Sequence, residues 1–209
     1  MKHLSKTAVY VAVLLFMFLL LTAFREPILA ADQSLFVVIN SLSNPLLDFI
    51  FVPLTYYGST LFWLFMIFLF WIKNDKKISV HLIYAFAIDL FMSMSLKWFF
   101  QRDRPEGLLR HFVLSESDFG SSFPSGHAEK AFSGSAILSK FYQPKLAFYG
   151  IAALTALSRI YIGAHYPIDV LFGSVIGLMA GNIALSLPTK HVEEKINRLV
   201  HELKSGLKN

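Results

Sequence analysis

Long apolar segments constrain this chain more than any other feature of its sequence. Residues 7–24 contain no charged side chain, and similar apolar runs recur along the chain as far as Pro188. A helix needs roughly 17–25 consecutive apolar residues to cross the hydrocarbon core of a bilayer. Because 55% of the 209 residues are hydrophobic and are grouped in such blocks, the sequence indicates an integral membrane protein rather than a soluble domain.

The apolar runs divide into six predicted transmembrane helices, so the expected fold class is all-α. Residues 25–48 are mixed and amphipathic, and we expect them to lie along the membrane surface. Pro167 suits the first turn of the last span, where a missing N–H group removes no needed hydrogen bond. The bundle is predicted as one domain over residues 1–188, and residues 189–209 as an amphipathic or solvated tail. The six predicted spans are 7–24, 50–72, 78–100, 125–141, 146–162 and 167–188.

The positions of the lysines predict how the bundle is oriented. With six spans, the lysines near the start of the chain, in two of the turns and in the tail all fall on one side. The positive-inside rule makes that side cytoplasmic, with both termini. The loop over 101–124 and the turn around His165 are then outside a plasma membrane. Four arginines lie on that outer side against the rule, so we expect them to have a function there: Arg102, Arg104, Arg110 and Arg159.

Composition excludes several kinds of site. The chain has no cysteine, which excludes disulfides, thiolate metal ligands and cysteine nucleophiles. The net charge of +5 is modest, and no nucleic-acid partner is predicted from it. Asp103 and the other acids of the 101–124 loop show no recognisable metal-ligand spacing, so no metal site is predicted.

The first of three polar motifs is KWFFQRDRP, in which Lys97 lies near the outer end of the third span and Arg104 just beyond it. Two cations at this level suit an anion. Long basic side chains at an interface also anchor helices by extending to the headgroups, so this motif alone leaves both interpretations open.

The second motif is PSGH, Pro124 to His127, at the start of the fourth span. Ser125 suits a helix N-cap, and the free N–H groups of a first helical turn, with the helix dipole, bind anions. Gly126 lets an anion approach the backbone closely, and His127 suits proton or phosphoryl transfer. A plain helix cap beside an unrelated histidine is the alternative.

The third motif is SRIYIGAHYPID, which places His165 and Asp169 four residues apart at the mouth of the sixth span. A carboxylate at this spacing can hold one imidazole nitrogen, fixing the tautomer and leaving the other nitrogen free to react. A His–Asp pair that only caps a helix is a common alternative. Taken together, however, the motifs bring cations, a helix start and two histidines to one membrane face, which describes a phosphate pocket with a nucleophile and an acid.

These motifs resemble the three signatures of the type-2 phosphatidic acid phosphatases, the membrane lipid phosphate phosphatases. All three are complete and in order. The family also includes soluble acid phosphatases and vanadium haloperoxidases, and six spans favour the lipid branch. The matching residues are K-x6-R-P at Lys97 to Arg104-Pro105, P-S-G-H at Pro124 to His127, and S-R-x5-H-x3-D at Ser158-Arg159, His165 and Asp169.

The resemblance implies a role for each matching residue. His165 is expected to be the nucleophile that forms a phosphohistidine, and Asp169 the carboxylate that orients it. His127 is expected to protonate the leaving alkoxide and later to activate water. Because the expected cradle consists of protein donors, no metal or other cofactor is expected. That cradle comprises Lys97, Arg104, Ser125, Gly126 and Arg159.

The resemblance leaves the substrate and some alternatives open. A polyprenyl (undecaprenyl-type) diphosphate is the first choice, because an outward site suits a carrier released outside; phosphatidylglycerophosphate and phosphatidic acid also fit. The expected partners are therefore a membrane lipid phosphate and the bilayer. A phosphotransferase of the same family is the first alternative. A transporter is the second, on the strength of Asp89, Glu129 and Lys130 within the spans, but it predicts repeats across two halves that the sequence lacks.

Overall fold

The structure is a computed structural model that describes residues 2–105 and 120–206, with side chains over 6–105 and 120–198. The middle of the predicted external loop, residues 106–119, lies outside the described residues. Throughout the described part the chain forms helices joined by turns and loops, which confirms the all-α class. In chain order the elements are α1 (Lys2–Ala23), α2 (Arg25–Ser41), α3 (Pro45–Thr55), the 3-10 turn η1 (Tyr56–Gly58), α4 (Thr60–Ile72), α5 (Lys76–Phe100), α6 (Gly126–Phe141), α7 (Lys145–Tyr161), α8 (Pro167–Ser186) and α9 (Lys190–Gly206).

The helices α1, α5, α6, α7 and α8 each cover one predicted span. By length and composition, α1, α5 and α8 could cross a membrane within the described residues, and the pair α2 and α3, bent by 117°, adds a fourth crossing if it is one broken span. Helices α6 and α7 have 16 and 17 residues, and the apolar α4 has 13. These three are at or below the shortest length that usually crosses a bilayer.

The prediction of one continuous helix over residues 50–72 is wrong. Helix α3 contains Pro53 and ends at Thr55, and the turn η1 follows it. The next helix has its own N-cap, because the Ser59 side chain accepts a hydrogen bond from the backbone N–H of Phe62 at 3.1 Å. A Cβ atom on Gly58 would lie 2.6 Å from the carbonyl oxygen of His127, so the break lets the backbone pack directly against the start of α6.

Helices α6 and α8 form the closest helix pair of the bundle core. Three glycines of α8, at positions 173, 177 and 181, follow one face at four-residue spacing and contact the backbone of α6. A Cβ atom on Gly177 would lie only 2.2 Å from the carbonyl oxygen of Glu129. Small residues at this spacing let helix backbones approach closely. The first turns of the two helices meet as well, since the Ser125 N–H donates to the Asp169 carbonyl oxygen at 3.0 Å.

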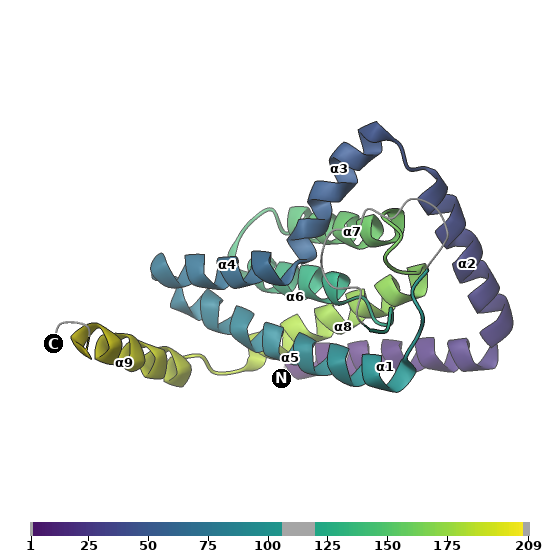
Figure 1. Cartoon of the computed structure of the whole chain (residues 1–209). Coiled ribbons are helices and arrows are strands. Elements are labelled where there is room, and N and C mark those ends of the chain that lie inside the picture. The colour runs from purple at the N-terminus through teal and green to yellow at the C-terminus, as the bar shows by residue number, and fades with distance from the viewer. Residues whose placement is uncertain (1, 106–119, 207–209) are drawn as a thin grey trace.

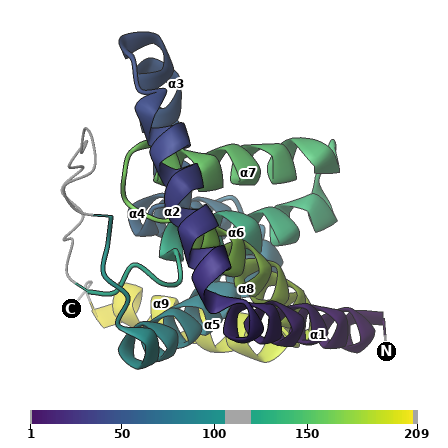
Figure 2. The same ribbon diagram turned by 90° about the vertical axis from the view of Figure 1, so that its right-hand side faces the viewer.

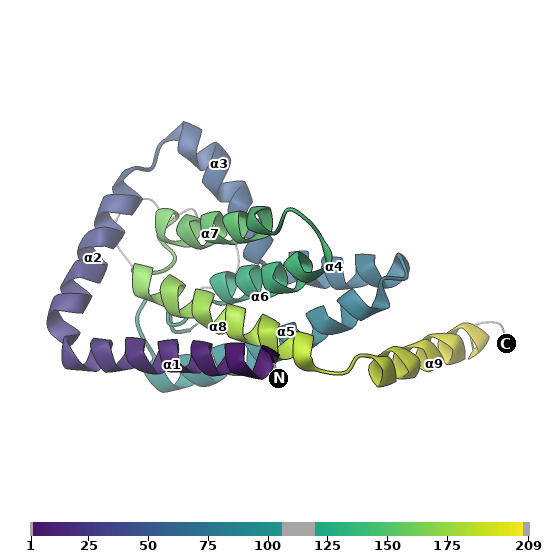
Figure 3. The same cartoon turned by 180° about the vertical axis from the view of Figure 1, so that it is seen from behind.

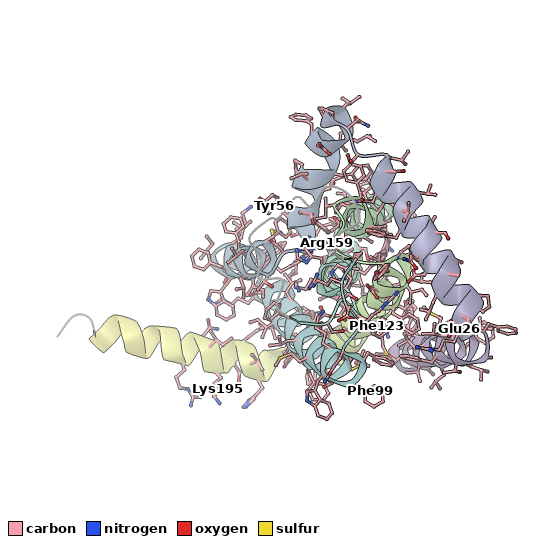
Figure 4. All side chains as sticks on the ribbon, turned by 45° about the vertical axis from the view of Figure 1, so that its right-hand side comes forward. Glu26, Tyr56, Phe99, Phe123, Arg159 and Lys195 are labelled. Atoms are coloured by element: carbon pink, nitrogen blue, oxygen red, sulfur yellow. The ribbon has the colours of Figure 1, made fainter. Side chains whose placement is uncertain are left out.

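The arrangement in space gathers the three polar motifs at one end of the bundle. In Figure 1 the turns between α4 and α5 and between α6 and α7 lie at the opposite end, together with the end of α8 and helix α9. Figure 3 shows the same grouping from behind. Figure 2 is viewed from the end where α6 and α8 begin, and there α2 crosses in front of both helices. The outside of the bundle carries large apolar side chains, including Trp98 at 77% and Phe99 at 72% exposure; Phe99 points outward in Figure 4.

Candidate active site

All eight residues singled out from the motifs lie at the end of the bundle where α6 and α8 begin. Lys97 is in the last turn of α5 and Arg104 follows that helix, while Arg159 is in the last turn of α7. His165 lies in the turn before α8, and Asp169 in its first turn. Ser125, Gly126 and His127 form the start of α6.

The His165 ring is held by a main-chain oxygen. The residue is 2% exposed, and its Nδ1 atom lies 2.7 Å from the carbonyl oxygen of Ser122. A carbonyl oxygen only accepts hydrogen bonds, so Nδ1 carries the proton and Nε2 carries the lone pair. Nε2 is therefore the ring atom available as a nucleophile.

The position of Asp169 differs from the expected direct hydrogen bond to His165. Its Oδ2 atom lies 3.7 Å from Nδ1 of His165, which is too long for a hydrogen bond. Oδ2 accepts instead from the Tyr166 N–H at 2.9 Å, and Oδ1 accepts from Arg102 at 2.7 Å. The carboxylate is thus close enough to act on the imidazole by its charge, while Ser122 fixes the tautomer.

Burial and the positive charges around His165 favour the neutral form of its imidazole. Burial is the largest cause that lowers the pKa of His165 well below its ordinary value, and nearby positive charges lower it further. A neutral imidazole is the form that attacks phosphorus. The positive groups that lower this pKa are Arg159, Arg104, Lys97 and His127.

The cationic side chains are fixed by oxygens of the surrounding backbone and helices. Lys97 Nζ donates to the Ser121 carbonyl at 2.5 Å, and Arg104 donates to the Ala164 carbonyl at 3.1 Å. Arg159 donates to the Thr55 hydroxyl at 2.7 Å, and Figure 4 shows it within the bundle. A cavity of about 550 Å³ opens beside Lys97 and Arg104, and its described lining includes Asp103 but neither His127 nor His165.

The start of α6 combines a helix cap with the second histidine. Ser125 is the N-cap, as predicted, and its fully buried side chain accepts from the Ala128 N–H at 3.5 Å. His127 is 9% exposed and packs against Gly58. The helix dipole places partial positive charge at this first turn, so it adds to the field of the cations.

Three residues near the site were missed as functional candidates by the sequence analysis: Asp32, Ser122 and Tyr166. Arg102 was expected to have a function on the outer side, but no role at the site was assigned to it. Asp32 belongs to α2, and with Phe36 and Asn40 it forms a buried stripe at four-residue spacing. An acid within such a stripe is a signal that it has a buried partner.

The charged residues inside the helices also have partners. Ser133 donates a hydrogen bond to the carboxylate of Asp89, and Ser93 hydrogen-bonds to Glu129, which also lies in the field of Lys130 and Lys97. Charges at this depth need such compensation. In the portion of the chain that the structure describes, no three histidine and acidic side chains come together in a way that could hold a metal ion.

Comparison with known proteins identifies the family to which this chain is related. A family model described as the PAP2 superfamily matches residues 78–193. The undecaprenyl-diphosphatase of Sulfolobus acidocaldarius is 28% identical over 200 residues, covering 90% of this chain and 97% of that protein. The structure of Aquifex aeolicus LpxE aligns with a TM-score of 0.64 at 32% identity, over 74% of this chain and 94% of its own. A PAP2 type phosphatidylglycerolphosphate phosphatase from Bacillus subtilis aligns with a TM-score of 0.71 at 25% identity, over 90% of this chain and 96% of its own.

Proposed function

The chain belongs to the PAP2 superfamily and is a membrane phosphatase, and on this premise we propose that it hydrolyses a lipid phosphate or diphosphate through a phosphohistidine on His165. The observation that carries the proposal is the buried His165 ring, whose Nδ1–H binds the Ser122 carbonyl and leaves Nε2 as the reactive nitrogen. Burial and four nearby positive groups lower the pKa of this ring, which favours the neutral form. A phosphoryl group needs little covalent chemistry from a protein beyond such positioning and charge stabilisation.

The reaction proceeds in two displacements. In the first, the Nε2 lone pair attacks phosphorus and the bond to the leaving oxygen breaks, while His127 gives that oxygen a proton. Lys97, Arg104 and Arg159, with the first turn of α6, stabilise the equatorial phosphoryl oxygens. In the second, His127 takes a proton from water as the water attacks the phosphohistidine, which releases phosphate and restores His165.

Asp169 acts on His165 through its charge. When Nε2 is phosphorylated, the ring gains positive charge because Nδ1 keeps its proton. The Asp169 carboxylate, 3.7 Å from Nδ1, stabilises that charge. At this distance Asp169 can stabilise the positive ring by its charge, although it does not hold the ring by a direct hydrogen bond.

A polyprenyl diphosphate of the undecaprenyl type is the substrate we favour. Support comes from the Sulfolobus acidocaldarius relative, which is named as an undecaprenyl-diphosphatase and matches along nearly its whole length. The phosphate cradle requires no metal in this proposal, because its cations are side chains.

The test is phosphate release in detergent, with EDTA present, from undecaprenyl diphosphate, phosphatidylglycerophosphate and phosphatidic acid. We expect turnover of all three with the diphosphate fastest, and inhibition by vanadate. Loss of all activity in EDTA, with recovery only on adding a metal ion, would show that the site has been misinterpreted. Transfer of phosphate to an added lipid alcohol in preference to water would identify a phosphotransferase.

The orientation we propose has six crossings, with the α4–α5 and α6–α7 turns cytoplasmic and the active site outside. The lysines of those turns support it by the positive-inside rule. Because the chain has no native cysteine, single cysteines report the two sides. An impermeant thiol reagent on intact cells should label Glu26→Cys, at the exposed start of α2, and should leave Lys145→Cys unlabelled until the cells are opened. The reverse pattern would place the site inside and remove the argument for a carrier released outside.

A further inference from the structure

A chain of ion pairs connects α2 to the catalytic turn through Arg102. One guanidinium nitrogen of Arg102 donates to Asp169 Oδ1 at 2.7 Å, and the other donates to Asp32 Oδ2 at 2.5 Å. The Arg102 guanidinium also lies over the Tyr166 ring, 4.2 Å from its centroid. We propose that Arg102 and Asp32 are positioning residues for the phosphatase reaction. Together they hold the Ser122 carbonyl and the Asp169 carboxylate, the two groups that face Nδ1 of His165. This inference rests on the proposed role of His165 as nucleophile.

Arg102 holds both of those groups, each by a different part of the residue. Its side chain binds Asp169. Its carbonyl oxygen accepts from the Ser122 N–H at 2.7 Å, and the Ser122 carbonyl is the acceptor for His165 Nδ1. Displacing Arg102 therefore disturbs two groups beside the His165 ring together: the Ser122 carbonyl that accepts its hydrogen bond and the Asp169 carboxylate. Arg102 itself is not hydrogen-bonded to the ring.

Asp32 fixes Arg102 from α2 and also binds α8 directly. Its Oδ1 atom accepts from the Ile168 N–H at 2.8 Å, and its side chain is fully buried. The N–H groups of a first helical turn lack partners within their own helix, so Asp32 caps α8 from another element. Figure 2 shows α2 crossing in front of α8, and Asp32 is the contact that fastens this crossing to the site.

A buried ion pair of this kind is weak evidence for stability, because removing charges from water is costly. The three charged groups have a clearer effect on His165. The guanidinium of Arg102 neutralises Asp169, the carboxylate nearest to the ring. The charged or titratable groups that face His165 from the other elements are Lys97 on α5, Arg104 after it, His127 on α6 and Arg159 on α7.

The experiment compares Arg102→Gln with Arg102→Lys across the pH range. Arg102→Gln leaves the Asp169 charge without its partner, so His165 binds a proton more readily and the neutral nucleophile is lost at higher pH. We expect the acid limb of kcat/KM to move up by about one pH unit, and kcat to fall by about 10²-fold with little change in KM. Arg102→Lys keeps the charge, so its acid limb should stay in place and much of kcat should return.

Asp32→Asn separates positioning from a general loss of structure. It removes a negative charge, which leaves Arg102 entirely to Asp169, so kcat should fall while the acid limb does not move to higher pH. Arg25→Gln is the matched control, because Arg25 is an exposed arginine paired with its neighbour Glu26, and it should change neither quantity. Thermal unfolding of each purified variant in detergent measures stability independently of these rates.

The inference is overturned if Arg102→Gln lowers only the thermal midpoint, or if Arg102→Gln and Asp32→Asn have the same pH profile. It is also overturned if Arg102→Lys is no better than Arg102→Gln in both kcat and acid limb. Failure of the proposed function has a different result, a phosphoenzyme that still forms in a His165→Ala protein. Adding His165→Ala to the variants of Arg102, Asp32 and Arg25 therefore distinguishes failure of this inference from failure of the proposed function.

Discussion

Replacing His165 with alanine should lower turnover by about 10⁴–10⁶-fold and leave no phosphoenzyme with any substrate. In the proposed reaction the ring supplies the atom that bonds to phosphorus, and alanine has no atom that can replace it. The measurement is phosphate release, together with acid-labile phosphate counted on enzyme quenched during turnover. An acid-labile phosphoenzyme in the His165→Ala protein would rule out the assigned nucleophile.

His81 provides a matched control for this substitution. It is also a buried histidine whose Nδ1 lies near a main-chain oxygen, the Ala184 carbonyl at 2.9 Å. It lies near the start of α5 and contacts the end of α8, away from the cationic side chains that are proposed to bind phosphate. We expect His81→Ala to lower stability while phosphohistidine still forms, which separates loss of a buried ring from loss of the nucleophile.

His127→Ala should produce a loss that depends on the leaving group. A poor alkoxide leaving group needs the proton that His127 provides, and general acid catalysis of this kind typically contributes 10²–10⁴-fold. We therefore expect a loss of about that size on a lipid monophosphate. The loss should be smaller on p-nitrophenyl phosphate or on a lipid diphosphate, whose leaving groups are more stable as anions.

The same variant should accumulate phosphohistidine, since the base that activates water is also missing. Single-turnover assays on the three substrates, with acid-labile phosphate followed over time, measure both effects. An equal loss on every leaving group would show that His127 binds phosphate or supports the fold rather than transferring the proton.

The sequence predicted local features of the fold well where one residue decides them. Ser125 caps α6 and Pro167 begins α8, as expected from a serine before a helix and a proline in a first turn. The break between α3 and α4 was missed although Pro53, Gly58 and the N-cap Ser59 lie within the predicted span, because the generally apolar character of residues 50–72 was interpreted as one helix. The close approach of Gly58 to His127, a residue far along the chain, is the part of this break that no local pattern shows.

At the candidate site, too, the sequence could not predict contacts between residues that are far apart along the chain. The four-residue spacing of His165 and Asp169 correctly indicates that they are neighbours, but it does not decide which atoms bond. The carboxylate is drawn to Arg102 and to the Tyr166 N–H, and the ring to a carbonyl oxygen. Asp32 was not a candidate because its partners lie 70 and 136 positions away, and no local pattern encodes a contact of that range.

The hydrogen bond between His165 and the Ser122 carbonyl has an evolutionary consequence. Every amino acid carries the same main-chain oxygen, so a substitution at position 122 changes the side chain and leaves the acceptor in place. Such a substitution would, however, remove the buried Ser122 hydroxyl that donates to the Asp103 carbonyl oxygen at 3.0 Å and helps to hold the backbone there. The tautomer of the His165 ring therefore depends on all the contacts that fix the path of the backbone at position 122, so it is a property of the fold rather than of one acceptor side chain.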